Sequence, residues 1–209
     1  MSEKRPLNGF FVCIYYLVNL VAGILHPVTI IGRENLPEHG ALLCPNHNSN
    51  WDPVLVALKV PVNYRLHIMA KKELFENPFL RAVLTSIGTF PISRGEADLS
   101  GIRTALRILK EGGLLCIFPE GTRNKARKEP LLPLQEGVAM ISLRAKAPIV
   151  PMWVDGGYAP WSRCVIGAGK PMDLGEYEGL RRVDAAAMKR LTAKMREDML
   201  AVRADILHR

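Results

Sequence analysis

Cysteine is scarce in this sequence, and its spacing fits neither a metal site nor a disulfide framework. The sequence has no CxxC pair and no histidine at zinc-ligand spacing, which argues against a metal site. The four cysteines, Cys13, Cys44, Cys116 and Cys164, are widely separated and lie among apolar neighbours, as buried reduced thiols do. We therefore expect a reducing, cytosolic environment. A chain of 209 residues can bury a core without covalent cross-links.

Aromatic and acidic residues are also few. Aromatic residues make up 7% of the sequence, and no helix-turn-helix or RNA-binding signature is present, which argues against a nucleic-acid partner. Lysine and arginine number 28 against 20 acidic residues, so the formal net charge is +8 and an anionic partner is expected. The mean hydropathy of +0.07 is high for a soluble domain and low for a multi-span membrane protein, which favours a protein that contacts a membrane.

The one long apolar run lies near the amino terminus, from Phe10 to Leu25, with Asn19 as its single polar side chain. As a helix it would extend about 24 Å, less than the roughly 30 Å of a bilayer core. A helix embedded in one leaflet, with Lys4 and Arg5 at the headgroups, suits this length best. A spanning helix, a signal peptide and an ordinary buried helix are the alternatives. We predict a membrane-associating segment at residues 1–27 and a monotopic or peripheral protein at the cytoplasmic face of the cell membrane.

Short β-rich runs alternate with helical patterns after this segment. Helices are predicted from Asp52-Pro53, with Asp52 as the N-cap, over about Asp98–Lys110, and over Gly137–Ala145. Such alternation predicts an α/β domain, residues 28–180, whose mixed, largely parallel sheet is flanked by helices. The predicted strands are Val28–Ile31, Ala41–Cys44, Leu66–Ala70, Gly88–Ser93, Leu114–Phe118, Ile149–Val154 and Cys164–Ile166.

The last stretch, Arg181–Arg209, has the pattern of a long amphipathic helix. Apolar side chains recur at steps of three and four residues, while lysine, arginine and aspartate fill the opposite face. The apolar positions are Met188, Leu191, Met195, Met199, Val202 and Ile206. We expect this helix, residues 181–209, to pack on the α/β domain. The sequence contains no internal repeat and no low-complexity tract.

The sequence PNHNSNWDP, at positions 45–53, contains a candidate catalytic pair. It follows a buried strand and precedes a helix, so it lies at the carboxyl end of a strand, where α/β proteins place their sites. With His47 in the loop and Asp52 at the helix start, the carboxylate can reach one imidazole nitrogen. The other nitrogen is then a fixed acceptor, as a general base for a hydroxyl requires. The alternative is that Asp52 only caps its helix and His47 satisfies loop carbonyls.

A second segment, with the sequence FPEGTR, also follows a strand. Gly121 permits close approach of the backbone, while Thr122 and Arg123 supply hydroxyl and guanidinium donors for a phosphate group. The alternative is a solvated turn in which Glu120 and Arg123 pair at the surface. Arg94 follows another short strand, and its positively charged side chain could lie at the same edge of the sheet.

Four blocks, in this order, resemble the glycerolipid acyltransferase family, and particularly its short bacterial 1-acyl-sn-glycerol-3-phosphate acyltransferases. The blocks are NHxxxxD at 46–52, FPISR at 90–94, FPEGTR at 118–123 and IVPM at 149–152. The sequence MAKKEL at 69–74 also looks like the family's stretch after its first block. The resemblance covers about residues 28–166, and the first and third blocks are its specific parts.

The resemblance implies a role for each matching residue. His47 is the base that removes the proton of an acceptor hydroxyl, and Asp52 orients it. The residues implied in substrate binding are Asn46, Arg94, Glu120, Gly121, Thr122, Arg123 and Pro151. The interior of the first block, Asn48 to Trp51, is variable in the family and leaves the headgroup of the acceptor open.

The implied reaction transfers a fatty acyl group from acyl-CoA or acyl carrier protein to the sn-2 hydroxyl of lysophosphatidic acid (1-acyl-sn-glycerol-3-phosphate) or a related lyso-lipid. With lysophosphatidic acid the product is phosphatidic acid, a step of phospholipid biosynthesis. An alcohol attacking a thioester needs no metal and no cofactor. The excess of basic residues fits a phosphorylated acceptor, an anionic donor carrier and an anionic membrane surface.

Two other classes of function compete with this interpretation. A serine hydrolase or thioesterase would use Ser49 or Ser93, but the sequence lacks a GxSxG elbow and Ser49 lies inside the histidine block. A non-enzymatic basic module would only bind membranes or nucleic acid. Release of CoA that depends on added lyso-lipid separates the three, because a hydrolase needs no acceptor and a binding module releases no CoA.

Overall fold

The computed structural model describes residues 27–61, 64, 66–86, 88–92, 99–156, 159, 161–180 and 182–208, together with Leu20. The apolar run Phe10–Leu25 lies outside these residues except for Leu20, so the membrane-associating segment stays a prediction. Within the described ranges, no helix combines the length and apolarity needed to cross a bilayer.

Seven strands of the described residues form one sheet in the order β1-β7-β6-β2-β5-β3-β4. β6 and β7 are antiparallel, and the other neighbouring pairs are parallel. This arrangement confirms the predicted α/β class with a mixed, largely parallel sheet, and the predicted strand ends shift by one or two residues. The strands are β1 (Val28–Ile31), β2 (Leu42–Cys44), β3 (Leu66–Lys71), β4 (Thr89–Ile92), β5 (Leu114–Cys116), β6 (Ile149–Gly156) and β7 (Cys164–Ala168).

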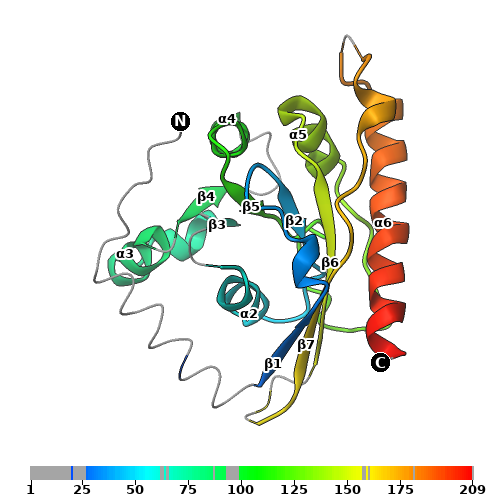
Figure 1. Ribbon diagram of the computed structural model, residues 1–209. Helices are drawn as coiled ribbons and strands as arrows, with labels where there is room; N and C mark the ends of the chain where they lie inside the picture. Colours follow the sequence, from blue (N-terminus) through cyan, green and yellow to red (C-terminus); the bar gives the residue numbers. More distant parts are fainter. Residues whose placement is uncertain are drawn as a thin grey trace.

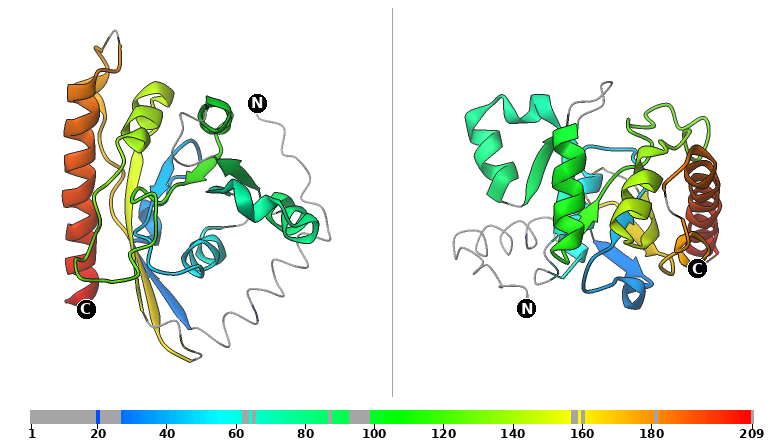
Figure 2. Two further views of the ribbon diagram at one scale, coloured as in Figure 1. Left: turned by 180° about the vertical axis from the view of Figure 1, so that it is seen from behind. Right: turned by 90° about the horizontal axis from the view of Figure 1, so that it is seen from above.

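Helices cover both faces of the sheet. α2 (Asp52–Lys59) lies on one face, and α4 (Leu99–Lys110), α5 (Gly137–Ala145) and α6 (Ala185–Leu207) lie on the other (Figures 1 and 2). The sequence did not lead us to expect α3 (Pro78–Ser86), which follows β3 and the 3₁₀ turn η3 (Lys72–Phe75). Two further 3₁₀ turns are η1 (Arg33–Asn35) and η4 (Gly175–Tyr177).

Successive side chains of a strand point to opposite faces of the sheet, so the core has two layers. In β2, Leu42 and Cys44 pack toward α4, α5 and α6, whereas Leu43 packs toward Leu55 and Val56 of α2. All five side chains are at most 2% exposed, because β2 is central and covered on both faces. The carboxyl end of β2 therefore emerges from a fully packed region, which gives the following loop a rigid base.

α6 confirms the predicted long amphipathic helix. Its N-cap is Asp184, whose Oδ1 accepts a hydrogen bond from the backbone N–H of Ala187 at 2.7 Å. The helix lies close against β7 because Gly167 has no side chain there. A Cβ at Gly167 would lie 2.6 Å from Cδ1 of Ile206, closer than any real contact. The apolar face of α6 is thus buried on the sheet, as the spacing of its apolar residues predicted.

The parallel strands β2, β5, β6, β3 and β4 all end at one edge of the sheet, which we call the carboxyl edge. The loop that contains His47 follows β2, and the FPEGTR segment follows β5. β2 and β5 are direct neighbours, so the topology brings the two segments together.

Candidate active site

Asn46 fastens the loop after β2 to the end of β6. Its Nδ2 donates to the backbone oxygen of Val154 at 3.1 Å, and its Oδ1 accepts from the backbone N–H of Val154 at 2.6 Å. The side chain is fully buried. These two bonds use the amide at both ends and fix where the loop begins, while substrate binding by Asn46 stays a prediction.

His47 and Asp52 form a hydrogen-bonded pair inside this loop. Nδ1 of His47 lies 3.0 Å from Oδ2 of Asp52, and the aspartate is fully buried. A buried carboxylate accepts hydrogen bonds, so it favours the tautomer in which Nδ1 carries the proton. Nε2 is then the acceptor nitrogen, and no hydrogen bond from the described residues occupies it. The pair has the arrangement expected of an oriented general base.

Asp52 also shapes the backbone of the loop. The same Oδ2 atom accepts hydrogen bonds from the N–H groups of Asn48 at 2.6 Å and of Ser49 at 2.7 Å. Our prediction that Asp52 is the N-cap was wrong, because α2 begins at Asp52 itself and Trp51 occupies the N-cap position. All three partners of Oδ2 precede the helix, so this carboxylate oxygen faces the loop.

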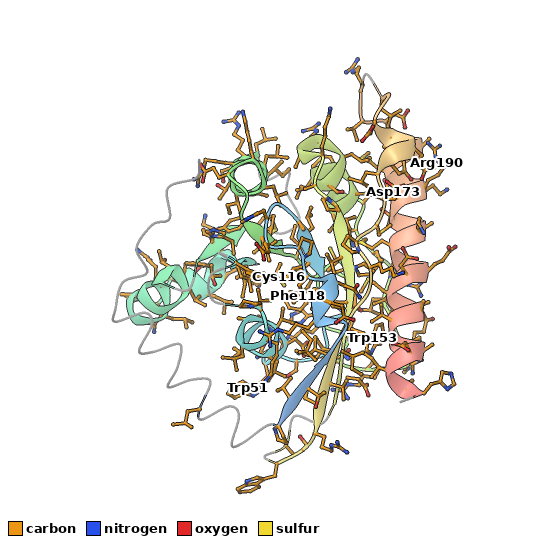
Figure 3. The ribbon with its side chains drawn as sticks, viewed as in Figure 1. Trp51, Cys116, Phe118, Trp153, Asp173 and Arg190 are labelled. Carbon is orange, nitrogen blue, oxygen red and sulfur yellow. The ribbon has the colours of Figure 1, made fainter. Side chains whose placement is uncertain are left out.

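The imidazole of His47 packs against an aromatic ring from the neighbouring strand. The ring centroids of His47 and Phe118 are 4.2 Å apart, with a tilt of 32° between the planes. Phe118 lies between α2 and the sheet, whereas Trp51 lies farther from the core, below α2 (Figure 3). His47 is 8% exposed, so the imidazole is held by Asp52 and Phe118 and still reaches the surface.

Glu120 joins the second segment to the first. Its Oε1 accepts a hydrogen bond from the backbone N–H of His47 at 2.7 Å, and its Oε2 accepts one from the N–H of Leu132 at 2.9 Å. Glu120 is 2% exposed, and burial raises the pKa of its carboxyl although both hydrogen bonds act to lower it. The alternative of a surface pair between Glu120 and Arg123 in a solvated turn is therefore wrong for Glu120.

Asn124 makes a second link that sequence reasoning missed. Its backbone N–H donates to the backbone oxygen of His47 at 2.7 Å. Its buried side chain donates to the carbonyl of Glu129 at 2.8 Å and accepts from the N–H of Arg127 at 3.1 Å. An asparagine directly after FPEGTR and before a basic run was a local signal for such a turn. Residues that follow β5 thus bind both the backbone N–H and the backbone carbonyl of His47.

The rest of the FPEGTR turn faces outward. Gly121 has φ +66°, a conformation that favours glycine, and a Cβ there would lie 3.2 Å from Cγ of Gln135. Thr122 is exposed and Arg123 is half-buried. These two residues follow Gly121 in the same turn as Glu120, so the structure places their donors in the turn that is bonded to the His47 loop.

Two predicted site residues are not brought to this group. Pro151 lies within β6, in register with Cys44, on the α6 side of the sheet. There it lines a cleft of about 560 Å³ together with α6 residues such as Asp198 and Val202, whereas Phe118 belongs to the α2 side. Arg94 and Ser93 lie outside the described residues. Roles for Pro151 and Arg94 stay predictions.

The described part of the chain contains no group of three or more histidine, cysteine, aspartate or glutamate side chains that could hold a metal ion. The candidate site itself offers several chemical groups. These are an oriented imidazole, a buried aspartate, and hydroxyl and guanidinium donors on the adjacent turn.

The fold and the paired loops define an α/β protein with an oriented histidine at the carboxyl edge of its sheet. Residues 27–155 match the Acyltransferase family, and the chain belongs to that family. The matched region contains the His47 loop and the FPEGTR turn. It ends at Asp155, one residue after the strand position that Asn46 holds.

Several curated relatives carry the same name. The chain is 36% identical over 129 residues to the 1-acyl-sn-glycerol-3-phosphate acyltransferase of Bacillus subtilis, covering 62% of this chain and 63% of that protein. It is 29% identical over 187 residues to the enzyme of that name from Streptococcus pneumoniae, covering 84% and 68%. The chain thus spans less than two thirds of the Bacillus relative, and 46% of the Saccharomyces cerevisiae protein of the same name.

A solved structure has the same fold. The crystal structure of the 1-acyl-sn-glycerophosphate (LPA) acyltransferase PlsC from Thermotoga maritima aligns with a TM-score of 0.69 and 19% sequence identity. The alignment covers 97% of this chain and 83% of that chain. At this identity the similarity shows that the folds agree.

Proposed function

We propose that the chain transfers a fatty acyl group from an acyl thioester to the free sn-2 hydroxyl of 1-acyl-sn-glycerol-3-phosphate, giving phosphatidic acid. The donor is acyl-CoA or acyl carrier protein. The observation that carries the proposal is the 3.0 Å contact between Nδ1 of His47 and the buried carboxylate of Asp52. The names of the relatives from Bacillus subtilis and Streptococcus pneumoniae support the choice of acceptor.

His47 acts as the general base in this proposal. As the acceptor oxygen attacks the thioester carbonyl carbon, its proton moves to Nε2, and Asp52 stabilises the imidazolium that forms. When the tetrahedral intermediate collapses, the C–S bond breaks and the proton on Nε2 passes to the leaving sulfur. The products are the ester and the free thiol, and the imidazole returns to its starting state.

Glu120 and Asn124 hold the backbone of His47 in position before substrate binds. They hold the N–H and the carbonyl of His47 in place, so the base does not have to be ordered when substrate binds. We assign Thr122 and Arg123 to the acceptor phosphate, because a hydroxyl and a planar guanidinium on one turn match phosphate oxygens. The predicted segment 1–27 holds the enzyme at the cytoplasmic face of the membrane, where the lyso-lipid resides.

The test is product analysis by mass spectrometry with lysophosphatidic acid, lyso-lipids with larger headgroups, and both acyl donors. The proposal predicts phosphatidic acid as the product and release of the donor thiol only when the acceptor is present. Thiol release without acceptor would indicate a hydrolase, and no release with any acceptor would indicate a binding module. Either result would overturn the proposal.

A further inference from the structure

Two of the three tryptophans in the chain are exposed, and both lie at the carboxyl edge. Trp153 is buried at 3% exposure, whereas Trp51 is 47% and Trp161 is 74% exposed. Trp51 directly precedes Asp52 in the loop after β2. Trp161 lies in the turn that joins β6 to β7, beyond the carboxyl end of β6. Since β2 and β6 are parallel neighbours, both tryptophans flank the edge that carries His47.

The backbone of Trp161 is in a conformation that glycine normally occupies. The N–H of Ser162 donates to the carbonyl of Ala159 at 3.1 Å, which closes a four-residue turn, and Trp161 at its third position has φ +63°. A positive φ at that position is the mark of a turn that usually selects glycine or asparagine. A tryptophan with 74% of its surface exposed gains little packing there. The indole therefore serves neither the turn nor the core, and such strain is a reason to look for a function outside the fold.

The charges near these tryptophans are mostly basic. Arg163 is exposed two residues after Trp161, and Lys125, Arg127 and Lys128 are exposed in the segment after β5, at the same edge. The exposed acids in these two stretches are Asp155 at the end of β6 and Glu129 directly after Lys128. Indole rings favour the boundary between water and acyl chains, and lysine and arginine favour anionic headgroups. Both preferences are met by one kind of partner, a lipid surface with negative charge.

We propose that the carboxyl edge docks on an anionic bilayer through Trp51 and Trp161. This contact belongs to the folded domain and is separate from the predicted segment 1–27. The inference rests on the proposed function in one respect, namely that a lyso-lipid acceptor resides in the bilayer. Docking by this edge would turn the loop that contains His47 toward the membrane, so the acceptor hydroxyl could reach the base without leaving the lipid phase.

Quenching by brominated lipid tests the insertion of each indole directly. The full-length protein is mixed with vesicles of phosphatidylcholine and phosphatidylglycerol that carry brominated acyl chains. Wild-type fluorescence should be quenched, W161F should lose a large part of the quenching, and W51F/W161F should lose nearly all of it, because Trp153 is buried. This signal reports where the indoles lie, even if another segment also holds the protein on the vesicle. Equal quenching of wild type and W51F/W161F, or none in either, would overturn the proposal.

Two further variants separate docking from folding. Trp161→Gly places glycine at φ +63°, so its melting temperature should equal or exceed that of wild type while its vesicle affinity falls. The matched control is Leu180→Ala, which removes another exposed apolar side chain; Leu180 lies just before the start of α6, the end of that helix opposite the β6–β7 turn (Figure 1). Leu180→Ala should bind vesicles as wild type does. A clear fall in melting temperature for Trp161→Gly would assign the indole to the fold and overturn the argument.

An enzyme assay in detergent distinguishes this proposal from the proposed function. Trp161→Gly should transfer acyl groups to detergent-dispersed lysophosphatidic acid at the wild-type rate and lose activity on vesicles. If wild type transfers no acyl group but its tryptophans are quenched, the proposed function fails and the docking surface stands. If transfer occurs and vesicle activity is unchanged in Trp161→Gly, the docking surface fails and the function stands. If Trp161→Gly weakened binding to purely zwitterionic vesicles and left binding to anionic vesicles unchanged, the choice of an anionic surface would also be contradicted.

Discussion

Glu120 accepts the backbone N–H of His47 at 2.7 Å and, through its other carboxylate oxygen, the N–H of Leu132 at 2.9 Å. The residue that the family resemblance assigned to substrate binding is thus occupied with holding the candidate base. Burying a carboxylate costs free energy, as the raised pKa of Glu120 shows. The presence of this carboxylate beside His47 therefore indicates that the position of His47 is important for function.

Glu120→Gln tests this relationship. An amide can accept one of the two N–H groups, but its NH₂ faces the other, so a buried donor is left without an acceptor. We expect the free energy of unfolding to fall by about 1–3 kcal/mol and kcat to fall with it. The matched control is Glu129→Gln, an exposed carboxylate of the same segment, which should change neither quantity. Urea unfolding and steady-state kinetics on both variants decide the matter. Indistinguishable behaviour of the two would contradict the assigned role of Glu120.

Arg196 of α6 extends the same network. Its guanidinium donates to the backbone oxygens of Leu132 at 2.9 Å and of Leu131 at 3.1 Å, and the N–H of Leu132 in turn bonds to Glu120. Arg196→Ala should therefore lower stability by roughly 1.5–3 kcal/mol and reduce kcat severalfold. Arg196→Lys should recover only part of the loss, because one ammonium cannot replace the planar fork.

Lys194→Ala is the control for Arg196. Lys194 lies on the same helix and makes an exposed pair with Asp198 at 3.4 Å, an interaction that contributes at most about 1 kcal/mol. Its loss should leave kcat unchanged. If Arg196→Ala behaved like Lys194→Ala in both kinetics and unfolding, the hydrogen bonds of Arg196 would have no effect on the catalytic loop.

The buried thiols lead to a prediction about labelling. Burial raises the pKa of Cys44 and Cys116 well above the ordinary value and that of Cys164 to about 12, so all three stay protonated and inaccessible at pH 8. In a Cys13→Ser variant, Ellman's reagent should react with none of them in the folded protein. All three should react once urea unfolds it. Fast reaction of two thiols in native buffer would contradict the core packing.

Much of the fold follows from local pattern. The short apolar runs that contain β2 and β5 end at Pro45 and Pro119, so the strands and the loops after them could be predicted. α3 was missed although a local signal existed. Asn77 precedes Pro78, and its Oδ1 accepts the N–H of Leu80 at 3.1 Å, which is the geometry of an N-cap followed by proline at N1.

The candidate site could be predicted only in part. His47 and the FPEGTR turn each follow a strand, so both could be placed at the carboxyl edge. The spacing of His47 and Asp52 in a loop predicted their contact. The partners of Glu120 and Arg196 are backbone groups of a segment with no periodic pattern, and no local rule specifies them. β1 and β7 are the first and last strands in sequence order, so their pairing depends on the topology of the whole sheet and not on a local pattern.

Asp52→Asn should affect both the candidate base and the loop that holds it. Oδ2 of Asp52 accepts the N–H groups of Asn48 and Ser49 as well as Nδ1 of His47. Asparagine keeps an acceptor oxygen but removes the charge that strengthens all three bonds. We therefore expect this variant to lose both activity and some stability of the loop, measured as kcat and as melting temperature. Wild-type kcat in Asp52→Asn would show that the carboxylate does not support the base.

In the proposed reaction, His47 is the base that accepts the proton of the lyso-lipid hydroxyl. The most direct measurement is kcat for acceptor-dependent release of CoA or acyl carrier protein thiol by His47→Ala, with phosphatidic acid identified by mass spectrometry. We expect kcat to fall by about 10²–10⁴-fold, which is the usual contribution of a general base, while KM for lysophosphatidic acid changes little. A His47→Ala enzyme that folds as wild type does and retains kcat within a few-fold of it would show that His47 is not the base.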